Sequence, residues 1–351
     1  MRMILNTTTN ALSERRTPTI AALAALALIT AACSGTSSVS GPATTDASTM
    51  ESTPLTDAPP TENLVALATT SIWADVTSRA LCEAPVDTVI PIGADPHSWE
   101  PSIRVTADLA AADLVIRNGL DLEEGLLGAL DAIDTSQTTV VTLSGLISNA
   151  DDDHSDADDH DHDESTDDDH NDHDHSGPDP HLWLDPVLVA DLVDGIASAA
   201  VAAGWPTTVI DCAATYHEEL LALDAEIADA VVTLNPNARI LVTNHDALGR
   251  FADRYGFEVL GSVLPSLSTL AEANPADLAE LATAITTTGV SAIFVDAQSS
   301  DTDAQALARR LEGVEVVTLL TGSLTSGTDD GRDYLTMMRT NTSRIVDALG
   351  S

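Results

Sequence analysis

Histidine and aspartate crowd into one short stretch of this chain. From Asp151 to His175 the sequence reads DDDHSDADDHDHDESTDDDHNDHDH, which holds fourteen of the 56 acidic residues and six of the ten histidines. Because the stretch has no aromatic or β-branched aliphatic residue that could build a core, we predict a disordered loop over residues 150–177. Imidazole nitrogens among carboxylate oxygens are the ligand set for a divalent metal such as zinc.

The loop histidines predict an auxiliary metal site of low affinity. They are His154, His160, His162, His170, His173 and His175. Since each imidazole must be neutral to bind, binding is expected to fade below roughly pH 6, and the crowded carboxylates should move that point upward. The loop would capture scarce metal or sense its excess; a solvated acidic linker with no transport role is the alternative.

Three of the other histidines lie in loop-like motifs. His97 is part of GADPHSWEPS, His181 of PDPHLWLDP and His245 of TNHDALGRF, and Asp296 closes the apolar run SAIFVD. His97, His245 and Asp296 follow predicted strands, and ligands bind beyond the carboxyl ends of strands in open parallel sheets. We therefore predict a closed tetrahedral zinc site of three imidazoles and one carboxylate. For any one histidine alone, a hydrogen bond at a strand end is the simpler alternative.

Residues next to these ligand candidates have two interpretations each. Asp95 and Asp179 stand two positions before His97 and His181, where they could orient an imidazole or form the turn before a proline. Trp99 and Trp183 stand two positions after the same histidines and either wall the site or pack in the core. His217, beside two glutamates in a helical stretch, is predicted to be a surface residue.

Alternating apolar runs and helical periodicity supply the elements that would position these groups. This alternation predicts an α/β fold with two lobes, each built on a parallel sheet, joined by one long helix. The strands are expected at 64–70, 86–92, 112–118, 138–143, 238–244, 257–263, 290–296 and 314–320. The helices are expected at 72–82, 104–111, 121–134, 186–204, 207–232, 247–255, 275–288, 301–311 and 331–349.

The first part of the chain differs in composition from the rest. Residues 1–33 are predicted to be a signal peptide, because Arg15 and Arg16 precede an apolar run that leads to Thr30-Ala31-Ala32-Cys33. This end resembles a bacterial lipobox, so Cys33 is the predicted lipid-bearing residue; a plain cleaved signal is the alternative. Residues 34–61, rich in Ser, Thr and Pro, are predicted to be a flexible tether.

The remaining boundaries follow from the predicted elements. An N-terminal α/β lobe is expected over 62–205, including the acidic loop 150–177, a linking helix over 206–234, and a C-terminal α/β lobe over 235–351. The net charge of −42, with no Lys among the fourteen basic residues, argues against nucleic acid as a partner. In an exported protein Cys82 and Cys212 are expected to form a disulfide, although two buried free thiols are the alternative.

Six motifs resemble the zinc-binding substrate-binding proteins of ABC importers, the cluster A-I or ZnuA/TroA-like family. Over roughly residues 62–349 the chain carries, in the family's order, GADPHSWEPS, NGLDLEEGL, PDPHLWLDP, NHDALGRFADRYGF, IFVDAQ and YLTMMRTNTSRIVDAL. The resemblance implies two Rossmann-like lobes joined by one rigid long helix, with a metal between the lobes. The ligands that it implies for this metal are His97, His181, His245 and Asp296. It also implies an acidic, His-rich loop before the second Asp-Pro-His motif.

The same resemblance implies a role and partners. The expected function is that of an extracytoplasmic binding protein, not an enzyme, which carries Zn²⁺ as transported ligand to an ABC permease and its ATPase subunit. It would be a monomer anchored to the outer face of the cell membrane by lipid on Cys33, or periplasmic. A histidine at position 245 favours zinc over manganese, whereas Asp296 stands where many zinc-specific relatives have Glu. A manganese-specific binding protein, a zinc enzyme and a surface metal-buffering adhesin are the alternatives.

Overall fold

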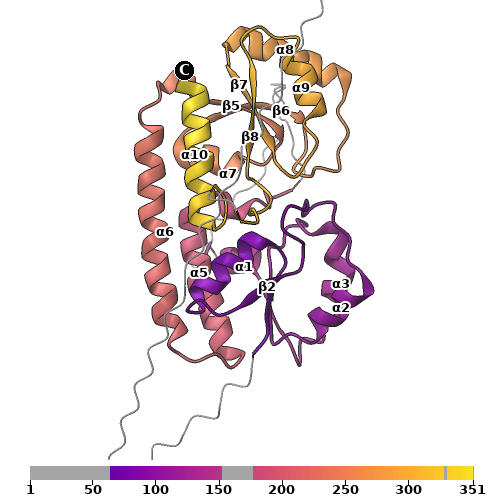
Figure 1. Cartoon of the computed structure of the whole chain (residues 1–351), viewed down its shortest axis with the longest axis vertical. Helices are drawn as coiled ribbons and strands as arrows, with labels where there is room; N and C mark the ends of the chain where they lie inside the picture. The colour runs from indigo at the N-terminus through magenta and orange to yellow at the C-terminus, as the bar shows by residue number, and fades with distance from the viewer. Residues whose placement is uncertain (1–63, 152–176, 328–329, 351) are drawn as a thin grey trace, which may run out of the picture. The chain divides into compact units, whose positions relative to one another are not determined.

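Two parallel sheets of four strands each form the framework of the protein (Figure 1). The computed structural model describes residues 64–151, 177–327 and 330–350, all within one compact unit that begins at Asp57. The N-terminal sheet has the order β2-β1-β3-β4 and consists of β1 (Ala66–Ala68), β2 (Val86–Thr88), β3 (Leu114–Arg117) and β4 (Thr139–Thr142). The C-terminal sheet has the order β6-β5-β7-β8 and consists of β5 (Ile240–His245), β6 (Glu258–Leu264), β7 (Ala292–Asp296) and β8 (Glu315–Leu319). The predicted α/β class with two parallel sheets is confirmed.

Helices connect the strands of each sheet and join the two lobes. The N-terminal lobe contains α1 (Ser71–Ala80), α2 (Ile103–Ala110), the 3-10 turn η1 (Glu124–Leu126), α3 (Leu127–Asp131) and α4 (Leu143–Asp151). Along the chain, the described elements between α4 and the first strand of the C-terminal sheet are η3 (Leu182–Leu184), α5 (Pro186–Ala202), α6 (Val209–Val231) and η4 (Pro236–Ala238). The C-terminal lobe contains α7 (Gly249–Tyr255), α8 (Pro275–Thr288), α9 (Thr302–Ala308) and α10 (Tyr334–Gly350).

Local sequence signals explain several helix ends. The Asp185 carboxylate caps α5 by accepting from the N–H of Val187 at 2.9 Å, and Pro186 occupies the first turn, where a missing N–H costs nothing. Gly256 ends α7 and Gly289 ends α8 with φ of 71° and 73°, the left-handed conformation that glycine adopts without strain.

One hydrophobic core runs through both lobes. It joins residues of both sheets, such as Leu114 and Phe294, to the buried sides of α1, α5, α6 and α10. The long helix α6 contributes its apolar stripe to this core and contacts both α5 and α10, beside which it lies in Figure 1. Because a close-packed interior resists deformation, this shared core favours small adjustments between the lobes over a wide opening.

Cys82 and Cys212 form a disulfide with a Cα–Cα distance of 5.3 Å. The bond joins the turn after α1 to the first turn of α6, across 130 positions of sequence. A covalent link over so long a loop restricts the unfolded chain and so stabilises the folded one. It fastens the N-terminal lobe to the helix that leads to the C-terminal lobe.

The helix expected over 121–134 is the main element that the sequence misplaced. The structure instead has η1 and α3, which together cover only Glu124–Asp131. Leu120 and Asp121 have φ of 55° and 56°, a left-handed conformation that cannot belong to a right-handed helix. The buried Glu123 carboxylate imposes this turn by accepting hydrogen bonds from the N–H groups of Asn118 and Gly119 and from the Thr69 hydroxyl. The helix α4 was not expected from the sequence.

Several sequence predictions concern residues that the structure does not describe. The signal peptide 1–33 with Cys33, the tether 34–61 and most of the acidic loop 150–177 lie outside the described residues. Within the described ranges, none of the helices has the length and apolar character needed to cross a bilayer. The lobe boundaries at 62–205, 206–234 and 235–351 stay predictions.

Candidate metal centre

Three buried imidazoles from distant parts of the sequence meet between the sheets. His97 follows β2, His181 precedes η3, and His245 is the last residue of β5; one ring nitrogen of each lies within 4.8 Å of the others. The Nε2 atoms of His181 and His245 are 3.3 Å apart. Two nitrogens bound at about 2.05 Å to one tetrahedral ion lie roughly 3.3 Å from each other, so this spacing suits a shared zinc-sized cation.

The rings face one another at similar distances. The ring centroids of His97 and His181 are 5.5 Å apart, those of His97 and His245 are 5.7 Å apart, and those of His181 and His245 are 5.3 Å apart. These residues are only 2–4% exposed. The geometry is that of a closed pocket with convergent nitrogens, not of three separate histidines at strand ends.

Asp296 is the fourth predicted ligand and lies at the end of β7. Its side chain lines the same cavity as the three imidazoles, together with Trp183, Thr321 and Gly322. Among the described residues, however, the tight cluster comprises the three histidines and leaves the Asp296 carboxylate outside. The structure thus brings all four predicted residues to one cavity, and the three histidines lie closest to one another. Their role as ligands stays a prediction.

Burial sets the protonation of the cavity. Desolvation, together with charge repulsion from the neighbouring His181, lowers the pKa of His97 to about 4, although Asp95 and Asp179 act in the opposite direction. Desolvation also lowers the pKa of His245 well below its ordinary value. Both imidazoles are therefore neutral at neutral pH, which is the state that binds metal. Burial raises the pKa of Asp296 to about 6, so this carboxylate is charged at neutral pH.

Asp179 orients the ring of His181. One carboxylate oxygen, Oδ1, lies 2.7 Å from His181 Nδ1 and also accepts from the main-chain N–H of His181 at 2.9 Å. Although burial raises the pKa of Asp179, its hydrogen bonds with His181 hold that pKa below the usual range. A charged carboxylate at Nδ1 keeps the proton on that nitrogen and leaves the Nε2 lone pair directed at the cluster.

Asp95 has a different role from Asp179. It accepts from the main-chain N–H of His97 and from the Ser98 hydroxyl, both at 3.0 Å, so it forms the turn before His97. The two tryptophans also differ. Trp183 is buried with its ring 5.5 Å from that of His181 and donates to the carbonyl of Thr321 at 2.7 Å, so it walls the site. Trp99 packs against the core of the N-terminal lobe.

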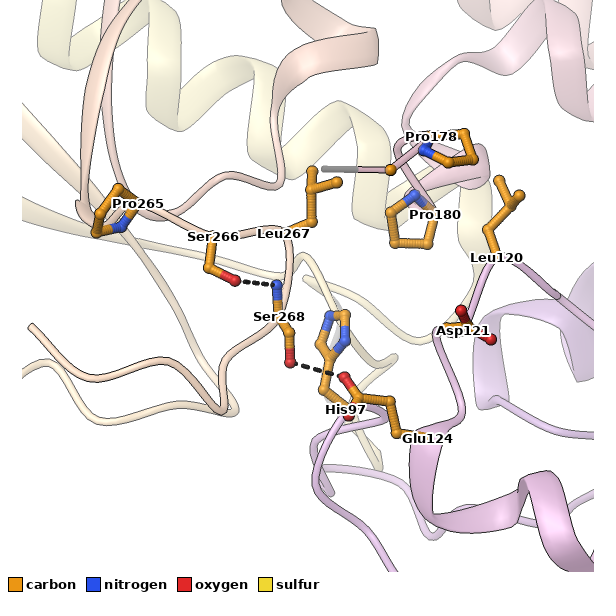
Figure 2. A pocket seen from close by; sticks show the side chains of 11 residues that line it. His97, Leu120, Asp121, Glu124, Pro178, Pro180, Pro265, Ser266, Leu267 and Ser268 are labelled. Atoms are coloured by element: carbon orange, nitrogen blue, oxygen red, sulfur yellow. Dashed lines mark hydrogen bonds between the residues drawn. The ribbon is translucent and has the colours of Figure 1, made fainter. Parts of the chain in front are cut away.

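A cavity of about 350 Å³ leads to His97 (Figure 2). Asp121 and Glu124 line it on one side, and the segment 265–268 lines it on the other. Ser268 Oγ donates to Glu124 Oε1 at 2.9 Å, as Figure 2 shows, and Thr269 Oγ1 donates to Asp95 Oδ2 at 2.5 Å. Two hydroxyls of the C-terminal lobe therefore form hydrogen bonds with two carboxylates of the N-terminal lobe beside His97.

A sequence profile of the family described as zinc-uptake complex component A, periplasmic, matches residues 67–348. The chain belongs to this family. It is 28% identical over 263 residues to the zinc-binding lipoprotein AdcA of Streptococcus pneumoniae, with 74% of this chain covered. It is 27% identical over 298 residues to the manganese-binding lipoprotein MntA of Bacillus subtilis, covering 82% of this chain and 90% of that protein. The chain spans only 50% of the length of AdcA.

Solved structures of similar proteins share the fold. The periplasmic zinc-binding protein TroA from Treponema pallidum superimposes with a TM-score of 0.69 at 26% identity, covering 82% of this chain and 99% of TroA. The resemblance to a ZnuA/TroA-like family expected from the sequence motifs is thereby confirmed.

The other predicted histidines are the six of the acidic loop and His217. The six loop histidines from His154 to His175 are outside the described residues. His217 lies on α6, partly buried, with Nδ1 3.2 Å from a carboxylate oxygen of Asp194 on α5. It is therefore less exposed than the surface position expected for it, because α5 packs against α6 at this point.

Sequence reasoning missed three residues at the centre. Thr321 and Gly322 follow β8 and line the cavity, and a Cβ on Gly322 would lie 3.5 Å from Asp296 Oδ2. The rule that ligands gather at the carboxyl ends of strands could have found them, because β8 ends at Leu319. Arg250, which contacts Asp179, has no comparable signal in the sequence.

Proposed function

We propose that this protein is the extracytoplasmic binding component of an ABC importer and carries one divalent metal ion between its lobes. The convergence of His97, His181 and His245 within 4.8 Å is the observation that supports this proposal most directly. Membership of the zinc-uptake family gives the context, and relatives named as zinc- or manganese-binding lipoproteins agree with it. The permease and its ATPase subunit are the proposed partners.

Zinc is the proposed cargo. Neutral imidazoles suit zinc, whereas manganese favours a larger share of oxygen ligands. With Asp296 as the fourth ligand, the set would be three nitrogens and one oxygen, which fills a tetrahedral ion completely. A filled site supports binding and delivery over catalysis, because a catalytic zinc usually keeps one position open for water.

The proposed location follows from the first part of the sequence. Lipid on Cys33 would hold the protein at the outer face of the membrane, and residues 34–61 would act as a tether. A monomer is proposed, because the described residues of one chain supply all four ligands.

The decisive experiment measures metal stoichiometry and preference. We expect the purified, chelator-stripped protein to take up one tightly held zinc ion per chain, and to prefer zinc when equal zinc and manganese are offered under competition with a chelator. Mass spectrometry of the bound metal gives the stoichiometry. Tight manganese with weak zinc would support the manganese-specific alternative. Absence of any tight ion would refute the proposed function.

Ion release should depend on the two hydroxyl contacts beside His97. Replacing both residues, Ser268→Ala with Thr269→Ala, is expected to speed zinc transfer to an excess of chelator by about tenfold, since each contact contributes roughly 0.5–1.5 kcal/mol to the closed state. Stopped-flow transfer to a coloured chelator measures the rate.

The matched control for this double variant is Thr283→Ala with Thr287→Ala on α8. Those two hydroxyls donate to carbonyls of their own helix at 2.9 and 2.8 Å and lie far from His97 in sequence and contacts. Equal transfer rates in both double variants would show that the contacts of Ser268 and Thr269 do not limit release.

A further inference from the structure

We propose that Arg250 is a positioning residue of the metal centre. It fixes the position of Asp179, and Asp179 in turn orients the ring of His181 toward His245. This inference rests on the proposed function, since it concerns the same three imidazoles. Arg250 touches no imidazole itself, so its effect would pass through Asp179.

The contacts of Arg250 converge on one residue. Its Nη2 and Nε atoms donate to the main-chain carbonyl of Asp179 at 2.6 and 3.1 Å, and Nε lies 3.9 Å from the Asp179 carboxylate oxygen Oδ2. The other carboxylate oxygen, Oδ1, is the one that contacts His181 Nδ1. One guanidinium therefore fixes the main chain of Asp179 and offsets its charge, while the carboxylate fixes the ring.

The backbone of α7 also approaches this aspartate closely. A Cβ placed on Gly249 would lie 3.1 Å from Asp179 Oδ2, a distance that would force a neighbour to shift. The segment from His245 to Arg250 therefore presents a metal-ligand candidate at one end and the group that grips Asp179 at the other. Because the segment is only six residues long, a displacement of α7 would move His245 and Arg250 together.

Pre-organisation is the physical consequence. Ligands that already stand in register lose less conformational freedom when the ion binds, so affinity rises without a new contact to the ion. Partners that orient a ligating imidazole typically change metal affinity by about 10–100-fold when they are removed. Arg250 lies one step further out, behind Asp179, so about tenfold is the effect we expect.

Arg254 on the same helix offers a matched control. Its guanidinium forms two hydrogen bonds with the Asp224 carboxylate of α6, at 2.8 and 2.7 Å, and its side chain is 35% exposed compared with 27% for Arg250. Both arginines thus tie α7 to a neighbouring segment by an ion pair. Arg254 Nε also lies 3.9 Å from a carboxylate oxygen of Asp185, four residues after His181. Of the two arginines, Arg250 is the one that contacts Asp179, the residue that orients the ring of His181.

The experiment compares Arg250→Ala, Arg250→Lys and Arg254→Ala in the full protein, with Zn²⁺ affinity from chelator competition and the visible absorption of bound Co²⁺ as readouts. We expect Arg250→Ala to weaken zinc binding about tenfold and to alter the Co²⁺ bands, because the ring of His181 loses its fixed orientation. Arg250→Lys should restore part of the affinity, since an ammonium can donate to the Asp179 carbonyl. Arg254→Ala should change neither readout.

Two outcomes would overturn the proposal. One is an unchanged affinity and Co²⁺ spectrum in Arg250→Ala; the other is an equal loss in Arg250→Ala and Arg254→Ala, which would indicate general destabilisation. If Arg250→Ala does not fold, Arg250→Met, which keeps an unbranched side chain but has neither donor nor charge, is judged by the same outcomes. Failure of the proposed function is a separate result, because the unaltered protein itself would then bind no ion tightly.

Discussion

Replacing His97 with alanine is expected to weaken tight zinc binding by about 10²–10³-fold. Structural zinc sites are worth about 10–16 kcal/mol in total, so one of four ligands accounts for roughly 3–4 kcal/mol. The buried position of His97 strengthens this expectation, because the cavity around it is lined by packed side chains that offer few substitute ligands. Competition with a chelator of known affinity measures the loss.

The contrast with the acidic loop makes this result specific. Deletion of residues 152–176 should remove weakly held ions and leave the single tight ion in place, because His97, His181 and His245 lie outside that segment. His217→Ala is the matched control, since this histidine is partly buried but pairs with Asp194 away from the cluster. Full tight stoichiometry in His97→Ala, together with its loss in the loop deletion, would place the tight site in the loop and refute our assignment.

The ligand candidates could be predicted because their signals are local. β5 ends at His245 and β7 ends at Asp296, and parallel strands bring their carboxyl ends to one edge of a sheet. The Asp-Pro-His segments carry His97 and His181 in turns whose aspartates accept the following main-chain N–H groups. Strand pattern and turn chemistry, both readable from neighbouring residues, therefore sufficed to find these four residues.

The rest of the site depends on contacts between residues far apart in sequence. The register between the lobes is set by the core shared among α1, α5, α6 and α10, which periodicity does not encode. Glu123 shows the same limit, since its hydrogen bonds to Asn118 and Thr69 override the helical pattern predicted from residue 121. Arg250 is a third example, at the metal centre. Its contact there is with Asp179, which lies 71 positions away in the sequence.

The pH dependence of folding should reveal a further connection between the lobes, outside the cavities around the three imidazoles. Asp75 on α1 accepts from the main-chain N–H of Tyr334, the first residue of α10, at 2.9 Å. Burial, helped by the charges of Asp333 and Glu83, raises the pKa of Asp75 from 3.8 to about 6, although the Tyr334 hydrogen bond and Arg79 act in the opposite direction. The folded protein therefore holds this proton more tightly than the unfolded chain does.

This difference fixes the sign of the effect. Between about pH 4 and pH 6 the folded state keeps a proton that the unfolded state has released, so the free energy of unfolding falls as pH rises through that window. Above it, ionised Asp75 costs the folded state about 1–3 kcal/mol, the upper figure corresponding to roughly two pKa units. Asp75→Asn should thus raise the free energy of unfolding at about pH 7.5, because the amide oxygen can still accept from Tyr334 without carrying charge.

Urea unfolding of the metal-stripped protein and of Asp75→Asn at several pH values tests this prediction. All other titrating groups, Asp296 included, are common to both proteins and cancel in the difference. The difference should therefore shrink toward zero as pH falls from about 6 to about 4, where Asp75 itself becomes neutral. A variant that is less stable than the unaltered protein at about pH 7.5, with the deficit vanishing toward pH 4, would show that the charge of Asp75 strengthens the link to α10 instead of weakening it. Zinc affinity should not change, because Asp75 lines none of the cavities around the three imidazoles.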